Sequence, residues 1–138
     1  MGAPLQQSFF VVLSVVADEG RYLMVRETKH GQRWYLPGGG VEEGESPRDG
    51  ARRETLEEAG IHIEPFAFLD VQHYIRPGPH VVLRFIVAAR PLTLSPKHFA
   101  DEHSLEARWL TREEIARLPL RDPEVLVHID HYERVFLR

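Results

Sequence analysis

Apolar residues near the start of the chain gather in short runs that are typical of β-strands. Phe9–Ala17 is an almost continuous apolar run rich in β-branched residues, and Arg21–Glu27 is a second such run. Because turn residues at 18–20 separate the two runs, we predict a hairpin whose first strand is buried. Trp34–Leu36 predicts a short extended segment. The Pro-Gly-Gly-Gly sequence at 37–40 predicts a turn whose backbone can approach a ligand closely.

The pattern between residues 46 and 60 is that of a helix with clear start and stop signals. Ser46 is a favourable N-cap, and Pro47 suits the first helical position. Asp49 stands where the acid of a capping box belongs, and Gly60 can end the helix in the left-handed conformation. We therefore predict a helix over Pro47–Ala59.

Strand-like sequence returns in the middle of the chain. Residues 61–74 and 80–89 are rich in apolar and β-branched residues, and the turn residues 76–79 between them predict a second hairpin. A polar loop at 91–104 follows, and Ala107–Leu110 predicts a short strand.

Two helices are predicted near the end of the sequence. A capping box at Thr111–Glu114 begins a brief helix that ends before Pro119, and Asp122 with Pro123 begins the last one. The apolar residues of the last helix recur at helical spacing, so we predict that they pack on the sheet. They are Val125, Leu126, Ile129, Tyr132, Val135 and Phe136.

Length and composition fit one folded domain over residues 1–138. The chain has 138 residues, too few for two domains that each bury a substantial core. Hydrophobic residues make up 43% and charged residues 28%, which excludes a disordered chain and a typical membrane protein. The apolar run near the N-terminus is shorter than the ~20 residues needed to cross a bilayer, and no leader pattern precedes it. We therefore expect a cytoplasmic protein that does not bind membranes.

The acidic excess is concentrated in one segment. The chain has 21 acidic residues against 17 Lys and Arg, a net charge of −4. Residues 42–58 contain seven acidic and three basic residues, so this segment accounts for the whole excess. No basic stripe follows any predicted element, which makes a nucleic-acid polymer an unsuitable partner. The absence of cysteine excludes disulfides, thiolate metal sites and cysteine nucleophiles.

Three glutamates crowd one face of the predicted 47–59 helix. Glu54, Glu57 and Glu58 are related as i, i+3 and i+4, a spacing at which like charges repel. A hard divalent cation such as Mg²⁺ or Mn²⁺, which prefers carboxylate and carbonyl oxygens, would relieve that repulsion. The alternative is a solvated acidic face with no ligand.

The spacing of these residues resembles the Nudix box, the signature of the Nudix hydrolase family. Seven positions agree with it: Gly39, Glu45, Arg53, Glu54, Glu57, Glu58 and Gly60. The aromatic residue and Pro-Gly-Gly before the box and the Glu-x-x-Trp-Leu sequence at 106–110 are also Nudix-like. Two positions depart from the pattern: Thr55 replaces a bulky aliphatic residue, and Gly50, near the glutamate face, is expected to leave room beside a metal. The resemblance implies an α/β fold, a Nudix-type α/β/α sandwich with a central mixed β-sheet.

The resemblance also implies site residues. Glu54, Glu57 and Glu58 would hold Mg²⁺, with Mn²⁺ as an alternative, and the Gly39 carbonyl would add a ligand. Arg53 would brace a glutamate, and Glu45 would cap or orient the loop and helix. The general base would be Glu57 or Glu58, with Glu102 on the 91–104 loop as a second choice. Further candidates for substrate binding are Gly38, Gly40, Arg26, Trp34, Tyr74 and Arg76. Each of these last four side chains has an equally simple reading as a structural or surface residue.

Three functions follow from the resemblance. The first is a Mg²⁺-dependent pyrophosphohydrolase in which water attacks phosphorus and a nucleoside di- or triphosphate yields the monophosphate. The flanking segments resemble members that act on oxidised guanine nucleotides such as 8-oxo-guanine nucleoside diphosphates. The second replaces that substrate by ADP-ribose, a nucleotide sugar or a dinucleoside polyphosphate. The third is a non-catalytic nucleotide-binding module. In each case the partner is a small-molecule nucleotide, and a homodimer is left open.

Overall fold

The computed structural model describes residues 7–76 and 80–137. Its strands are β1 (Gln7–Asp18), β2 (Arg21–Arg26), β3 (Trp34–Tyr35), β4 (Gly38–Gly40), β5 (Ile63–Arg76), β6 (His80–Pro91) and β7 (Glu106–Thr111). Its helices are the 3₁₀ turn η1 (His30–Gln32), α1 (Pro47–Ala59), α2 (Arg112–Ala116) and α3 (Glu124–Phe136). None of the helices in these ranges has the length and apolar character needed to cross a membrane.

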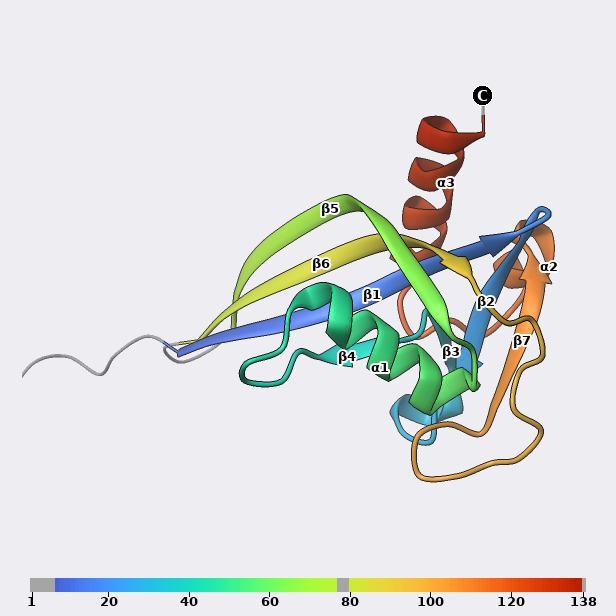
Figure 1. The fold of residues 1–138 in the computed structure, drawn as a ribbon, viewed down its shortest axis with the longest axis horizontal. Helices are drawn as coiled ribbons and strands as arrows, with labels where there is room; N and C mark the ends of the chain where they lie inside the picture. The colour runs from blue at the N-terminus through green and yellow to red at the C-terminus, as the bar shows by residue number, and fades with distance from the viewer. Residues whose placement is uncertain (1–6, 77–79, 138) are drawn as a thin grey trace, which may run out of the picture.

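The strands form one mixed sheet with β1 at its centre (Figure 1). The order is β3-β2-β1-β6-β5, while β4 also pairs with β1 and β7 pairs with β2. The β1–β6 pair is parallel and the other pairs are antiparallel. Both predicted hairpins are confirmed, because β1 meets β2 at Asp18–Arg21 and β5 meets β6 at Arg76–His80. Most of the turn predicted at 76–79 lies outside the described residues.

Helices cover both faces of the sheet. Val12 and Val16 of β1 belong to the core that includes Ala51 of α1. Leu13 and Val15, the alternate residues of the same strand, belong to the core with α2 and α3. Because successive side chains of a strand point to opposite faces, this alternation places the sheet between two helical layers. The α/β/α sandwich with a central mixed sheet is confirmed.

Helix α1 has the predicted bounds, Pro47–Ala59. The Ser46 hydroxyl accepts a hydrogen bond from the Asp49 amide at 3.1 Å, as an N-cap does. The Asp49 carboxylate contacts Arg52 at 2.8 Å, so it does not complete the predicted capping box. Gly60 adopts a φ of 71° and donates its N–H to Leu56, which ends the helix in the left-handed conformation.

The glycine sequence 37–40 is not the free turn that we predicted. Gly38–Gly40 is the strand β4, and its residues pair with Leu13, Val12 and Val11 of β1. A Cβ on Gly38 would lie only 2.1 Å from the carbonyl oxygen of Val12. Glycine is therefore required at 38 because the backbones of β4 and β1 pack closely there.

Gly50 and the end of α3 also differ from expectation. Gly50 is buried, and a Cβ there would meet Glu45, Val12 and Val41 at 3.1–3.4 Å. The missing side chain thus lets α1 pack against β1 and does not make room for a metal. In α3, Val125, Ile129 and Tyr132 are buried as predicted, and Leu126 packs partly against the same core. Val135 remains 46% exposed, contrary to the prediction. Phe136 is 37% exposed, but its ring lies 5.1 Å from the Phe66 ring of β5, so it contacts the sheet as predicted.

This burial pattern predicts a difference between two truncations in α3. Ile129→Ala, at a site with 0% exposure, should lower the free energy of unfolding by about 2–5 kcal/mol. Val135→Ala removes a half-exposed side chain and should change the free energy of unfolding by about 0.5 kcal/mol. Urea denaturation of both variants measures the difference. Equal losses would show that the end of α3 is packed as tightly as its middle.

Candidate active site

The C-terminal half of α1 lies directly against the glycine strand β4. The backbone N–H of Gly38 donates a hydrogen bond to the Glu58 carboxyl at 2.9 Å. A Cβ on Gly39 would lie 2.7 Å from Oε1 of Glu54. The glycines therefore let two carboxyls of α1 pack against bare backbone, and they bring together four of the predicted site residues.

Arg53 is the hub of the acidic cluster. Its Nε and Nη2 contact the two carboxylate oxygens of Glu45 at 2.9 and 3.0 Å, and Nη2 also donates to the Gly40 carbonyl at 2.9 Å. Its Nη1 lies 3.0 Å from Glu54 and 3.4 Å from Glu57. These bonds raise the pKa of Arg53 and lower that of Glu45. The guanidinium thus links the loop before α1 to the glutamate face of the helix.

Glu58 has the most perturbed carboxyl of the site. Burial, first of all, raises its pKa to about 9, and the negative charges of Glu54, Glu27 and Glu57 act in the same direction. The N–H of Gly38 opposes this rise. The pKa of Glu54 is raised as well, mainly because its carboxyl is removed from water. The cluster therefore lacks positive charge, and Glu58 keeps its proton at neutral pH.

The donor chemistry of this cluster suits a hard divalent cation. Glu54, Glu57, Glu58 and the carbonyl of Gly39 supply the oxygen ligands that Mg²⁺ prefers. As the side chains stand, no three acidic or histidine side chains in the described ranges converge on a single metal position. In this arrangement Nη1 of Arg53 contacts both Glu54 and Glu57. A cation bound there would take over the neutralising role of this contact.

A small cavity of about 190 Å³ opens beside the glycine strand, on the α3 side of the sheet. Its lining comprises Val11, Leu13, Tyr35, Gly38, Gly39, Gly40, Tyr74, Arg84 and Arg121. Arg84 is held by Gln72 at 2.7 Å, Tyr35 at 3.3 Å and Glu124 at 3.0 Å. Two guanidinium groups and two phenol rings therefore border the same glycines that contact the acidic cluster.

Arg121 completes the wall of this cavity. Its guanidinium lies 4.8 Å from the centre of the Tyr35 ring, and Nη1 contacts Glu27 at 2.9 Å. Tyr74 is 36% exposed, and its ring lies 5.6 Å from the Arg84 guanidinium. Aromatic rings can stack on a planar base and guanidinium groups can bind an anion, so this wall suits a nucleotide.

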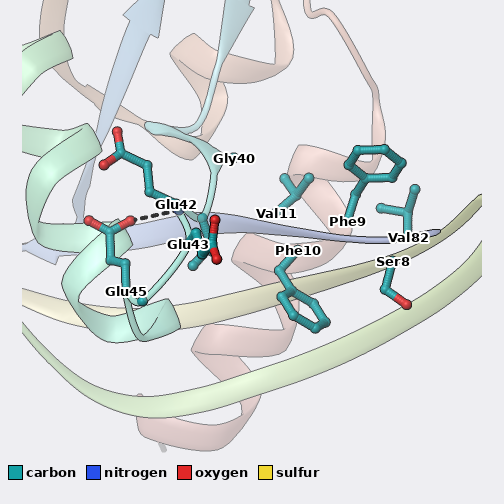
Figure 2. A pocket seen from close by; sticks show the side chains of 11 residues that line it. Ser8, Phe9, Phe10, Val11, Gly40, Glu42, Glu43, Glu45 and Val82 are labelled. Atoms are coloured by element: carbon teal, nitrogen blue, oxygen red, sulfur yellow. Dashed lines mark hydrogen bonds between the residues drawn. The ribbon is translucent and has the colours of Figure 1, made fainter.

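A larger hollow of about 540 Å³ lies at the start of β1. Figure 2 shows Phe9, Phe10 and Val82 of the sheet on one side of it and Glu42, Glu43 and Glu45 on the other. The amide of Glu42 donates to Glu45 at 3.1 Å. Of the three glycines this hollow reaches only Gly40, whereas the smaller cavity also reaches Gly38 and Gly39, which contact Glu58 and Glu54, so the hollow is a weaker candidate for the reacting group.

Three further residues that we predicted for the site do not line the 190 Å³ cavity: Arg26, Trp34 and Glu102. Arg26 is paired with Glu106 at 3.2 Å. Trp34 is only 7% exposed and packs in the core, so little of its ring is open to a base. The Glu102 side chain is 85% exposed and contacts His103 at 3.4 Å. The side chain of Arg76 lies outside the described part of the chain.

The sequence analysis missed several residues of the site. Nδ1 of His103 lies 3.7 Å from the Glu57 carboxylate. Glu27 raises the pKa of Glu58, and its Oε1 is buried with no hydrogen-bond partner among the described residues. Arg84 and Arg121 line the cavity. None of them has a characteristic spacing, because strand pairing and loop packing bring them from distant segments.

Comparison with known proteins agrees with this geometry. The family model of the NUDIX domain matches residues 5–130. The chain is 38% identical over 122 residues to the 8-oxo-dGDP phosphatase NUDT18 of Homo sapiens, covering 85% of this chain and 36% of that protein. It thus spans about a third of the length of its NUDT18 relatives.

Shorter relatives match over most of their length. Phosphatase NudJ of Shigella boydii is 35% identical over 124 residues, which are 88% of this chain and 81% of NudJ. A NUDIX hydrolase structure from Nitrosomonas europaea has a TM-score of 0.80 and 26% identity, covering 94% of this chain and 90% of its own. The fold, the box on α1 and these matches together show that the chain belongs to the Nudix family.

Proposed function

We propose that this chain is a metal-dependent Nudix pyrophosphohydrolase that converts a nucleoside di- or triphosphate to the monophosphate by attack of water on phosphorus. The observation that carries the proposal is the packing of Glu54 and Glu58 against Gly39 and Gly38. The same glycines also border a cavity lined by Arg84 and other polar groups, so the strand β4 lies between the carboxyls of α1 and that cavity.

An oxidised guanine nucleotide is the proposed substrate class. NUDT18 of Homo sapiens, a relative at 38% identity, is an 8-oxo-dGDP phosphatase. The cavity offers the Tyr74 ring for a planar base and the Arg121 guanidinium for an anion. Its small volume favours entry of part of a nucleotide, with the polyphosphate directed toward the glycine strand.

The proposed cofactor is Mg²⁺, with Mn²⁺ as an alternative. Nudix hydrolases generally need a divalent metal, and the residues that would hold it here are Glu54, Glu57, Glu58 and Gly39. When bound, the cation would polarise phosphoryl oxygens and lower the pKa of coordinated water.

The chain's own residues would prepare the site. The N–H of Gly38 holds the Glu58 carboxyl in place, and Arg53 fixes the positions of Glu54 and Glu57. Glu57 would accept the proton of the attacking water, or Glu58 would do so once a bound cation had displaced its own proton. Glu102, the second candidate for the base, lies on the loop that also carries His103.

Substitution of the acidic cluster tests the proposal. Glu57→Gln and Glu58→Gln should each lower kcat roughly 10²–10³-fold, because each removes a carboxyl that would bind the cation at the reacting centre. Glu113→Gln, an exposed glutamate of α2, is the matched control and should keep the wild-type rate. Turnover is measured with Mg²⁺ on a panel of nucleotides.

The same panel identifies the substrate. In H₂¹⁸O, the product that carries ¹⁸O shows which phosphorus was attacked. Release of a nucleoside monophosphate from 8-oxo-guanine nucleotides supports the proposed class. If the protein hydrolyses only ADP-ribose, a nucleotide sugar or a dinucleoside polyphosphate, the proposed substrate class is wrong. Wild-type rates in both glutamine variants would overturn the catalytic assignment.

The raised pKa of Glu58 predicts an unusual pH dependence of stability. The Glu58 carboxyl of the folded metal-free protein has a pKa of about 9, whereas in the unfolded chain it releases its proton near the ordinary glutamate pKa of 4.5. Because the folded state then binds more protons, this group lowers stability as pH rises between those values. The free energy of unfolding, measured in urea at pH 5.5 and 8.5 with a chelator, should fall more in the wild type than in Glu58→Gln. Identical pH slopes would refute the assignment.

A further inference from the structure

The loop between β6 and β7 is fastened to the C-terminal end of α1. The Lys97 amide donates to the carbonyl of Ala59 at 2.8 Å, and the Ser104 hydroxyl donates to the carbonyl of Glu58 at 2.5 Å. The Lys97 ammonium reaches the carbonyl of Glu57 at 3.4 Å. The last carbonyls of a helix have no partners within it, so one loop satisfies three of these acceptors. Figure 1 shows this loop passing the end of α1.

Lys97 is an almost fully enclosed cation. Its side chain is 5% exposed, and its ammonium lies 2.7 Å from the Asp101 carboxylate. A positive charge at this position also interacts favourably with the negative end of the helix dipole. A Cβ on Gly60 would lie 3.1–3.2 Å from the Cβ and N of Lys97, so the glycine lets the loop approach.

Asp101 orders the rest of the loop. Its Oδ1 accepts the backbone N–H groups of His103 at 2.8 Å and of Ser104 at 3.3 Å, in addition to the Lys97 ammonium. These bonds lower the pKa of Asp101 to about 2. The Asp101 carboxylate therefore connects the Lys97 ammonium to the backbone of His103. The side chain of His103 lies 3.7 Å from the Glu57 carboxylate.

We infer that Lys97, Asp101 and Ser104 form a helix clamp that holds the last turn of α1 and thereby positions Glu57 and Glu58 for catalysis. The inference rests on the proposed function, since it assigns these three as positioning residues for that reaction. The clamp contacts backbone carbonyls of the residues that carry the site carboxyls. A small displacement of this turn would move both carboxyls, and misplacement by about 1 Å can cost 10²-fold in rate.

A second ion pair provides a matched control. Arg112 binds Asp130 through two bonds of 2.6 and 2.9 Å, and this pair joins α2 to α3, which cover the face of the sheet opposite α1. Loss of either ion pair should reduce stability. Only loss of the clamp should disturb the glutamates.

The experiment compares Lys97→Met, Ser104→Ala and Arg112→Met by steady-state kinetics and by amide hydrogen exchange of the metal-free protein. Lys97→Met should lower kcat at least roughly tenfold while KM changes less than about twofold. It should also speed exchange of the amides at 57–60, and Ser104→Ala should act in the same direction to a smaller extent. Arg112→Met should leave kcat and these amides as in the wild type.

Three results would overturn the clamp. They are a wild-type kcat in both clamp variants, unchanged exchange at 57–60, or an equal loss of kcat in Arg112→Met. If Lys97→Met does not fold, Ser104→Ala decides alone. A wild-type protein that hydrolyses no nucleotide would defeat the proposed function instead, and the exchange data would still test whether the loop holds the helix end.

Discussion

The close approach of α1 to the glycine strand β4 is the constraint on which the rest of the site depends. A Cβ at Gly39 would displace the Glu54 carboxyl of α1, and a Cβ at Gly38 would collide with the backbone of Val12 in β1, so the two glycines keep both the helix carboxyl and the neighbouring strand in place. Gly50 allows a second close contact of the helix, where α1 packs against β1. The hydrogen bond from the Gly38 amide to Glu58 then fixes the helix against the sheet. The contact between α1 and the sheet therefore stabilises the fold and also positions the candidate site.

That interface concentrates negative charge, and the protein offsets it with few cations. The formal excess of −4 arises between residues 42 and 58. Arg53 contacts three glutamates of this segment at hydrogen-bond distances, while the buried carboxyl of Glu58 is left with a pKa of about 9. Lys97 adds a positive charge below the last turn of α1. A divalent cation would supply the charge that the cluster lacks.

Local signals predicted the helices and strands well, because their causes lie within a few residues. Ser46 and Gly60 bound α1 as predicted, and helical spacing placed the glutamates on one face. The sequence could not show that Gly38–Gly40 pairs with β1, because that pairing depends on a strand far away in the chain. Burial of Trp34 and the placement of His103 likewise depend on long-range packing. The sequence therefore predicted features that depend on neighbouring residues, but it did not predict which residues line the cavity.

The most direct test of the close α1–β4 contact is the cation affinity of two glycine variants, measured by titrating the metal-free protein with Mn²⁺. A Cβ at Gly39 would lie 2.7 Å from the Glu54 carboxylate, whereas one at Gly40 would meet nothing within 4 Å. Gly39→Ala should therefore weaken Mn²⁺ binding roughly 10–100-fold, and Gly40→Ala should change it less than about twofold. Equal affinities in the wild type and Gly39→Ala would contradict the account.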